Sequence, residues 1–197
     1  MMYDYKIILG ILAVVIGLIG YVPYYRDIFR GTTKPHPFSW FAFALLMGIT
    51  FFAQIFTGAG PGAWVTGISA VAVLGIAILS ILKGHREITT FDWFCFAGAL
   101  LGIVLWRATD DPLWAVVIVT VTDAIAFAPT YRKAYIEPHE ETASLFVFSA
   151  AKYFISLFAL VTFNLTTALF PVSLVATNAV FALVILIRRR QLGSRGY

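Results

Sequence analysis

The stretch YVPYYRDIFRGTTKPHPFSW, residues 21–40, lies where one long apolar segment ends and the next begins. It has a proline near the end of the first segment, then basic residues, then Pro-His-Pro. A weaker copy, FAPTYRKAYIEPHEETASLF, occupies residues 127–146. A shift of 106 residues places Pro23 on Pro129, and a Tyr-Arg pair follows in both copies. The repetition predicts two related units, each with this junction after its first helix.

The composition indicates a membrane protein. The chain has 197 residues, of which 60% are hydrophobic and 12% are charged, and its mean hydropathy is +0.88. A soluble domain is about a quarter charged. The apolar residues also form long uninterrupted blocks, which predicts a bilayer as the main partner. The net charge of +4 comes from residues between these blocks, so nucleic acid is not an expected partner.

The apolar blocks predict seven helices of about 19–23 residues, each long enough for a hydrocarbon core of about 30 Å. Their expected bounds are residues 6–25, 37–57, 62–83, 90–108, 112–134, 142–163 and 168–188. The breaks carry turn and cap signals. Residues 58–62 read Gly-Ala-Gly-Pro-Gly, Asp111 precedes a proline, and Thr89 and Thr90 are candidate caps of the fourth helix. All five tryptophans fall near predicted helix ends, which is typical of an interfacial aromatic belt.

The basic residues predict the orientation. With seven spans, one face receives eleven Lys and Arg residues and the other receives two, Lys6 and Arg107. The eleven are Arg26, Arg30, Lys34, Lys83, Arg86, Arg132, Lys133, Arg188, Arg189, Arg190 and Arg195. The positive-inside rule then places the N-terminus outside and the C-terminus in the cytoplasm. We expect a multi-pass protein of the plasma (inner) membrane.

The repeat and the span count predict an all-α membrane protein made of two parallel three-helix bundles joined by a linker helix. The first bundle covers residues 1–84, the linker 85–110 and the second bundle 111–190, with a short cytoplasmic tail at 191–197. Because three is odd, the lone fourth helix is needed to bring the second unit parallel to the first. Parallel repeats are a common transporter design, with the substrate site near the midplane.

Two ionisable residues fall in the middle of predicted spans. Asp123 is at the centre of 112–134, and Lys152 is near the centre of 142–163. A charge inside the bilayer costs about 2.5–3.5 kcal/mol on insertion scales, so each needs a reason. We expect the two side chains to pair across consecutive helices. The pair is either a structural salt bridge or part of a substrate cavity that exchanges a proton, and the sequence leaves both open.

Neutral polar residues complete the candidate substrate site. Asn178 lies at the same depth as the charges, and the first unit offers Ser69, Gln54 and Thr50. Gln54 fits cavity lining and interhelical hydrogen bonding equally well. Such a cavity is neutral and aromatic on one side and charged on the other. It suits a substrate with a flat or apolar part and polar groups.

The remaining prolines, histidines and cysteine give no sign of a catalytic or metal site. Pro23 and Pro129 interrupt helical hydrogen bonding, as tolerated kinks or as hinges of a cytoplasmic gate. The histidines His36, His85 and His139 fall in cytoplasmic loops, where we expect solvated side chains rather than metal ligands. The single cysteine forms no disulfide framework. We find no catalytic cluster, so we expect no enzyme activity, catalytic residue, metal or cofactor.

The 3+1+3 arrangement and the Pro-basic-aromatic junctions resemble the SWEET sugar transporters and the wider PQ-loop superfamily. The glutamine that names that motif is replaced by Tyr24 and Thr130. In SWEET transporters an asparagine on the last helix of each unit faces the substrate, and Asn178 and Ser69 stand at the matching positions. The resemblance implies transport of a sugar or another small polar metabolite by alternating access, and it supports the hinge role of the prolines.

The same resemblance leaves alternatives open. A vitamin or nucleoside uptake protein shares this fold, as does a non-transporting membrane receptor or scaffold of the KDEL-receptor kind. The short loops favour transport. The sequence leaves homo-oligomerisation and proton coupling open.

Overall fold

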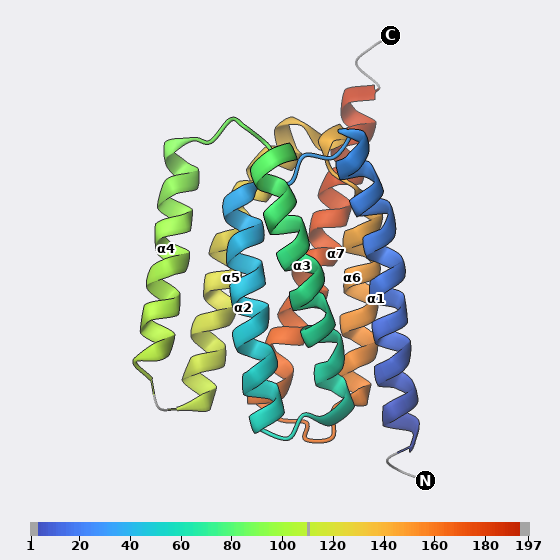
Figure 1. Cartoon of the computed structure of the whole chain (residues 1–197), viewed down its shortest axis with the longest axis vertical. Helices are drawn as coiled ribbons and strands as arrows, with labels where there is room; N and C mark the ends of the chain where they lie inside the picture. The colour runs from blue at the N-terminus through green and yellow to red at the C-terminus, as the bar shows by residue number, and fades with distance from the viewer. Residues whose placement is uncertain (1–3, 110, 194–197) are drawn as a thin grey trace.

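The structure is a computed structural model that describes residues 4–109 and 111–193. Over these residues it is all-helical, without strands (Figure 1). The helices are α1 (Asp4–Arg30), α2 (Pro37–Phe56), η1 (Gly60–Ala63), α3 (Trp64–Lys83), α4 (Thr90–Arg107), α5 (Pro112–Ile136), η2 (Pro138–Glu140), α6 (Ala143–Ala159) and α7 (Leu165–Gly193). Residues 194–197 of the expected tail lie outside the described part.

Each of the seven helices expected from the sequence is present. Five of them are long and apolar enough to cross a membrane: α1, α2, α3 with η1, α5 and α7. The other two contribute shorter apolar stretches, Thr90–Leu101 in α4 and Ala143–Ala159 in α6. Helix α6 ends at Ala159 rather than at the expected residue 163, and the amide of Val161 donates to the carbonyl of Ala59 instead of continuing the helix. Asn164 then caps α7, its Oδ1 accepting from the Thr167 amide at 3.0 Å. The chain therefore has the elements of a membrane-embedded protein.

Side-chain caps fix the N-terminal ends of α4 and α5. The Oδ1 of Asp111 accepts from the amide of Leu113 at 2.7 Å, with proline at the first position of α5. Thr89 and Asp92 form a reciprocal capping box, in which each side chain accepts from the other's amide, at 2.7 and 3.3 Å. The cap signals of the sequence are confirmed at Thr89 and Asp111.

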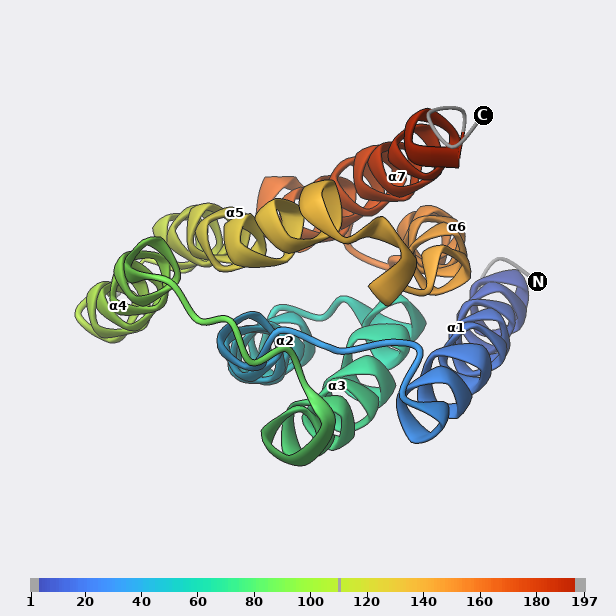
Figure 2. The same ribbon diagram turned by 90° about the horizontal axis from the view of Figure 1, so that it is seen from above.

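By their contacts we group the helices into a first set, α1–α3, and a second set, α5–α7, although the most extensive contact, that of α1 with α6, runs between the sets. In the first set α3 contacts both α1 and α2, and in the second set α7 contacts both α5 and α6. The sets meet where α1 packs on α6 and α2 packs on α5, while α4 lies at the edge against α5 and α2 (Figure 2). Consecutive helices α5 and α6 are thus held mainly by α7 rather than by each other.

Glycines allow the close contact between α1 and α6. A Cβ added to Gly20 would lie 2.5 Å from the Cβ of Phe148, and one added to Gly17 would lie 2.9 Å from the Cδ of Lys152. Real side chains do not approach this closely, so both positions need the bare backbone. Small residues at such contacts are typical of membrane helices, where close packing replaces the hydrophobic effect.

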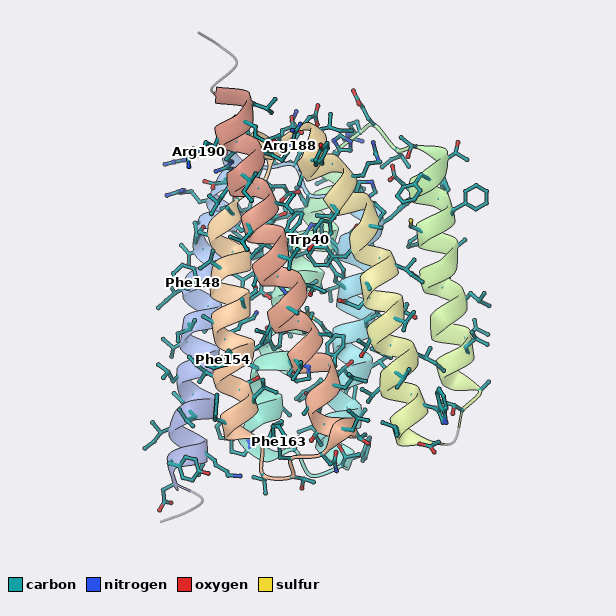
Figure 3. All side chains as sticks on the ribbon, turned by 180° about the vertical axis from the view of Figure 1, so that it is seen from behind. Trp40, Phe148, Phe154, Phe163, Arg188 and Arg190 are labelled. Carbon is teal, nitrogen blue, oxygen red and sulfur yellow. The ribbon has the colours of Figure 1, made fainter. Side chains whose placement is uncertain are left out.

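The outer surface is apolar and the interior holds polar groups. Phe154 and Phe163 lie on the outside, 54% and 68% exposed, while Trp40 lies between the helices with 3% exposure (Figure 3). The belt prediction is therefore wrong for Trp40, although Trp93 and Trp114 are exposed. Trp40 lies one turn into α2 and points inward, where its ring packs on Tyr24 of α1 with centroids 5.0 Å apart.

Both ends of the helix assembly are closed by bonded loops. At one end, which we call the basic end, lie the loops 31–36, 84–89 and 137–142 and the last turns of α7. There the amide of Lys34 donates to the carbonyl of Glu140 at 3.1 Å. At the opposite end the amide of Val161 donates to the carbonyl of Ala59 at 3.1 Å.

Candidate functional site

A small cavity lies at the centre of the molecule, between the two helix sets. Its lining comes from all six helices of the sets: Tyr21, Trp40, Phe43, Met47, Val73, Asp123, Phe127, Leu145, Phe146, Ser149, Tyr153, Leu174 and Asn178. Its volume is about 30 Å³. That is room for about two water molecules, whereas ligand pockets hold on the order of 300–1,000 Å³.

Aromatic rings form most of the cavity wall, and they bridge the two sets. Phe43 of α2 and Phe127 of α5 lie 4.9 Å apart between ring centroids. Phe127 in turn contacts Phe146 of α6, with centroids 6.2 Å apart. Such rings offer apolar faces to the flat or apolar part of a ligand.

Asp123 supplies the buried carboxylate of this cavity. The residue is 2% exposed, and its Oδ1 has no hydrogen-bond partner among the described residues. A buried carboxylate oxygen without a donor is costly, so native proteins retain one mainly for a function. Asp123 therefore lines the central cavity with an oxygen that no described residue satisfies.

Lys152 does not pair with Asp123 in the structure, so the expected ion pair is wrong. Its Nζ donates to the hydroxyls of Tyr21 at 3.0 Å and Ser69 at 2.7 Å, both in the first helix set. The ammonium also lies 4.4 Å and 4.9 Å from the ring centroids of Tyr21 and Tyr153. The reason is the packing: α6 turns Lys152 toward α1 and α3, whereas Asp123 on α5 faces the cavity beside α2.

Of the other four candidate residues, Asn178 lines the cavity and the remaining three do not. Asn178 lines the cavity, and its Nδ2 donates to the carbonyl of Leu174 at 2.8 Å. Ser69 does not line the cavity, and its hydroxyl accepts from Lys152 at 2.7 Å. Gln54 and Thr50 do not line the cavity, and their buried side-chain atoms have no hydrogen-bond partner among the described residues.

The hinge candidates lie inside continuous helices next to bonded tyrosines. Pro23 is in α1 and Pro129 is in α5. Pro171 occupies the interior of α7, which we did not single out from the sequence. The proline segments are held at the basic end, where the hydroxyl of Tyr24 donates to the carboxylate of Glu141 at 3.2 Å.

A buried ionic network closes the basic end, and the sequence did not predict it. The Nζ of Lys133 is fully buried and donates to the Glu141 carboxylate at 2.7 Å and to the carbonyl of Lys34 at 2.6 Å. Arg132 donates to the Asp92 carboxylate at 2.8 Å, which ties α5 to α4. Opposite charges at the helix ends and in the loops of this face were the available signal, but the partner of each charge depends on how these segments pack.

Two of the three histidines are buried, so the expectation of solvated side chains is wrong for them. His36 is fully buried and His85 is 5% exposed, and only His139 is exposed. Burial lowers the pKa of His36 to about 4, against a smaller opposing effect of the nearby Asp92 carboxylate. Burial also lowers the pKa of His85. The cause is the tight packing of loops 31–36 and 84–89, in which the His85 amide donates to the carbonyl of Pro35 at 3.0 Å.

Comparisons of this chain with protein-family models, curated proteins and solved structures found no match. The site therefore has to be interpreted from its own geometry.

Proposed function

We propose that this protein is a membrane transporter of a small solute, working by alternating access between α1–α3 and α5–α7 with α4 as the linker. In this proposal all seven helices cross the membrane, with the N-terminus outside and the basic end in the cytoplasm. The observation that carries the proposal is the small central cavity between the two sets, whose carboxylate and amide come from one set and whose aromatic wall comes from both. A site at the midplane between two repeats is the arrangement transporters use.

Contacts at equivalent positions support the two-repeat architecture. The hydroxyl of Tyr25 donates to the carbonyl of Ala72 at 2.5 Å, and the hydroxyl of Tyr131 donates to the carbonyl of Thr177 at 2.9 Å. The two tyrosines are equivalent in the sequence repeat, and both bonds run from the first helix of a set to its third. The pairing of α1 with α6 and of α2 with α5 also follows a twofold pattern.

The composition of the cavity favours a solute with an apolar or flat part and a polar group. Trp40 and Phe127 would contact the apolar part, and Asp123 and Asn178 would bind the polar part. A cavity of about 30 Å³ has room only for water. Solute binding therefore requires the two sets to separate at one end. The prolines Pro23 and Pro129 are the proposed hinges of this motion.

The test is flux in liposomes combined with a reversible lock. The hydroxyl oxygens of Thr33 and Thr142 lie 2.5 Å apart and belong to loops of different sets. Cysteine sulfurs at these positions would start near the S–S bond length of about 2.03–2.05 Å. In a Cys95→Ala background, we expect the Thr33→Cys, Thr142→Cys pair to stop flux when oxidised and to restore it when reduced.

The solute panel contains sugars, nucleosides and amino acids, and the single-cysteine variants are the controls. Undiminished flux through the oxidised pair would exclude alternating access. Binding of a solute without any flux would replace the transporter by a receptor.

A further inference from the structure

Three potential metal ligands converge at the basic end, outside the central cavity. They are His85 from the loop after α3, and Glu137 and Glu140 from the loop after α5. The Nδ1 of His85 lies 3.6 Å from the Oε2 of Glu137 and 3.8 Å from the Oε2 of Glu140. The three ligand atoms all lie within 4.8 Å of one another.

The two carboxyl groups contact each other, whereas no hydrogen bond joins His85 to either of them. His85 is 5% exposed, and the distances from its Nδ1 to the two carboxylates are too long for a hydrogen bond. The Oε2 of Glu140 is buried and has no partner among the described residues, while its Oε1 accepts from Lys34. The buried imidazole of His85 and the buried Oε2 of Glu140 therefore face each other, and neither gains a hydrogen bond from the other.

The cleft that holds the cluster carries charges of both signs. Lys34 pairs with Glu140, Lys133 with Glu141 and Arg132 with Asp92, while Lys83 and Arg86 line the cleft and donate to the carbonyls of Phe29 and Leu82. Glu137 has no Lys or Arg partner among the described residues. Glu87 lines the same solvent-open cleft as the cluster, which adds a second negative charge and gives an ion a path from the solvent.

We propose that His85, Glu137 and Glu140 bind a divalent transition-metal ion such as Zn²⁺. Zinc binds imidazole nitrogen and carboxylate oxygen at about 2.0–2.2 Å, so two tetrahedral ligands lie about 3.4 Å apart. The observed separations of 3.6 and 3.8 Å need only a small inward shift of the side chains. The imidazole favours zinc and similar ions over Mg²⁺ and Ca²⁺, which prefer oxygen ligands. Water from the open cleft completes the coordination.

The bound ion would join the two helix sets. Its histidine belongs to the loop that follows α3, and both glutamates belong to the loop between α5 and α6. The ion therefore adds a crosslink to the hydrogen bonds that close the basic end. Binding itself does not depend on the proposed transport, but its effect on opening does.

The experiment measures Zn²⁺ binding to the purified full-length protein in detergent after treatment with a chelator. Isothermal titration should give one site per chain, and X-ray absorption should show one nitrogen and carboxylate oxygens at about 2.0–2.2 Å. Thermal unfolding should shift upward with zinc, because the ion binds the folded state. His85→Ala and Glu137→Gln should each weaken binding at least tenfold.

His139→Ala is the matched control, since this exposed histidine lies in the same loop and should leave binding unchanged. Glu137→Gln keeps the size of the side chain, so it remains informative where His85→Ala fails to fold. Unchanged zinc affinity in Glu137→Gln, or equal loss in His139→Ala, would overturn the site. Zinc binding by wild type without any shift in unfolding would overturn the crosslink.

Discussion

The Nζ of Lys152 on α6 lies 2.7 Å from the Oγ of Ser69 on α3 and thereby joins the two helix sets at the middle of the molecule. Its other hydroxyl partner, Tyr21, lines the central cavity. Asp123 reaches that cavity from a different helix and has no bond to Lys152. The lysine is thus a contact between the sets, whereas the Oδ1 of Asp123 has no hydrogen-bond partner among the described residues.

Double-mutant cycles should separate these two roles. Groups in contact couple by about 0.5–3 kcal/mol, whereas independent sites are additive within about 0.5 kcal/mol. We expect Lys152→Met and Ser69→Ala to couple in the free energy of unfolding. We expect Lys152→Met and Asp123→Asn to be nearly additive. Unfolding in detergent measures both cycles, and stronger coupling in the second cycle would restore the Asp–Lys pair.

Substitution of Gly20 should loosen the contact between α1 and α6. An alanine Cβ would lie 2.5 Å from the Cβ of Phe148, so α1 or α6 must shift. We expect a loss of about 1–3 kcal/mol in unfolding free energy, as in overpacked cores. Gly48→Ala in α2 is the control, because nothing lies within 4 Å of the added Cβ. The control should be neutral or stabilising by up to about 1 kcal/mol. Equal effects at the two positions would contradict the close packing.

Removal of Lys133 should destabilise the basic end. Lys133→Met leaves the Glu141 carboxylate buried without its cation, which costs about 3–5 kcal/mol. Arg26→Ala breaks an exposed pair with Asp27 and should cost less than about 1 kcal/mol. Chemical unfolding of both variants checks the difference, and a mild effect at Lys133 would show that water reaches the pair.

Acid should destabilise the protein through His36. In the folded state burial lowers its pKa to about 4, while an unfolded histidine titrates near its ordinary value of 6.5. The unfolded state therefore binds the proton first, so stability is full above about pH 6.5 and falls as the pH decreases toward 4. Asp92 partly opposes this shift, and His85 and Arg132 reinforce it.

The measurement is the unfolding temperature of chelator-treated protein between pH 4 and 7. We expect the unfolding temperature of His36→Gln to fall less steeply with decreasing pH than that of wild type. Equal slopes would assign the acid sensitivity to other groups.

The sequence predicted the helices well because their signals are local. Apolar blocks, the turn at residues 58–62 and the cap at Asp111 each act within a few residues of where they occur. The depth of Asp123 and Asn178 also follows from counting along a helix. The partner of Lys152 could not be found in this way, because depth says nothing about which face of α6 meets which neighbour.

The sequence by itself determined the helical class, the membrane-like surface, the repeated junction at 21–40 and the polar residues in the middle of the helices. Only the tertiary structure decided which of these residues meet. It placed α7 between α5 and α6, turned Lys152 toward Ser69, and buried His36 and His85 under packed loops. The physical reason is that hydrophobicity and capping act along the chain. Ion pairs, cavities and metal ligands depend on distances of a few ångströms between segments that lie far apart in it.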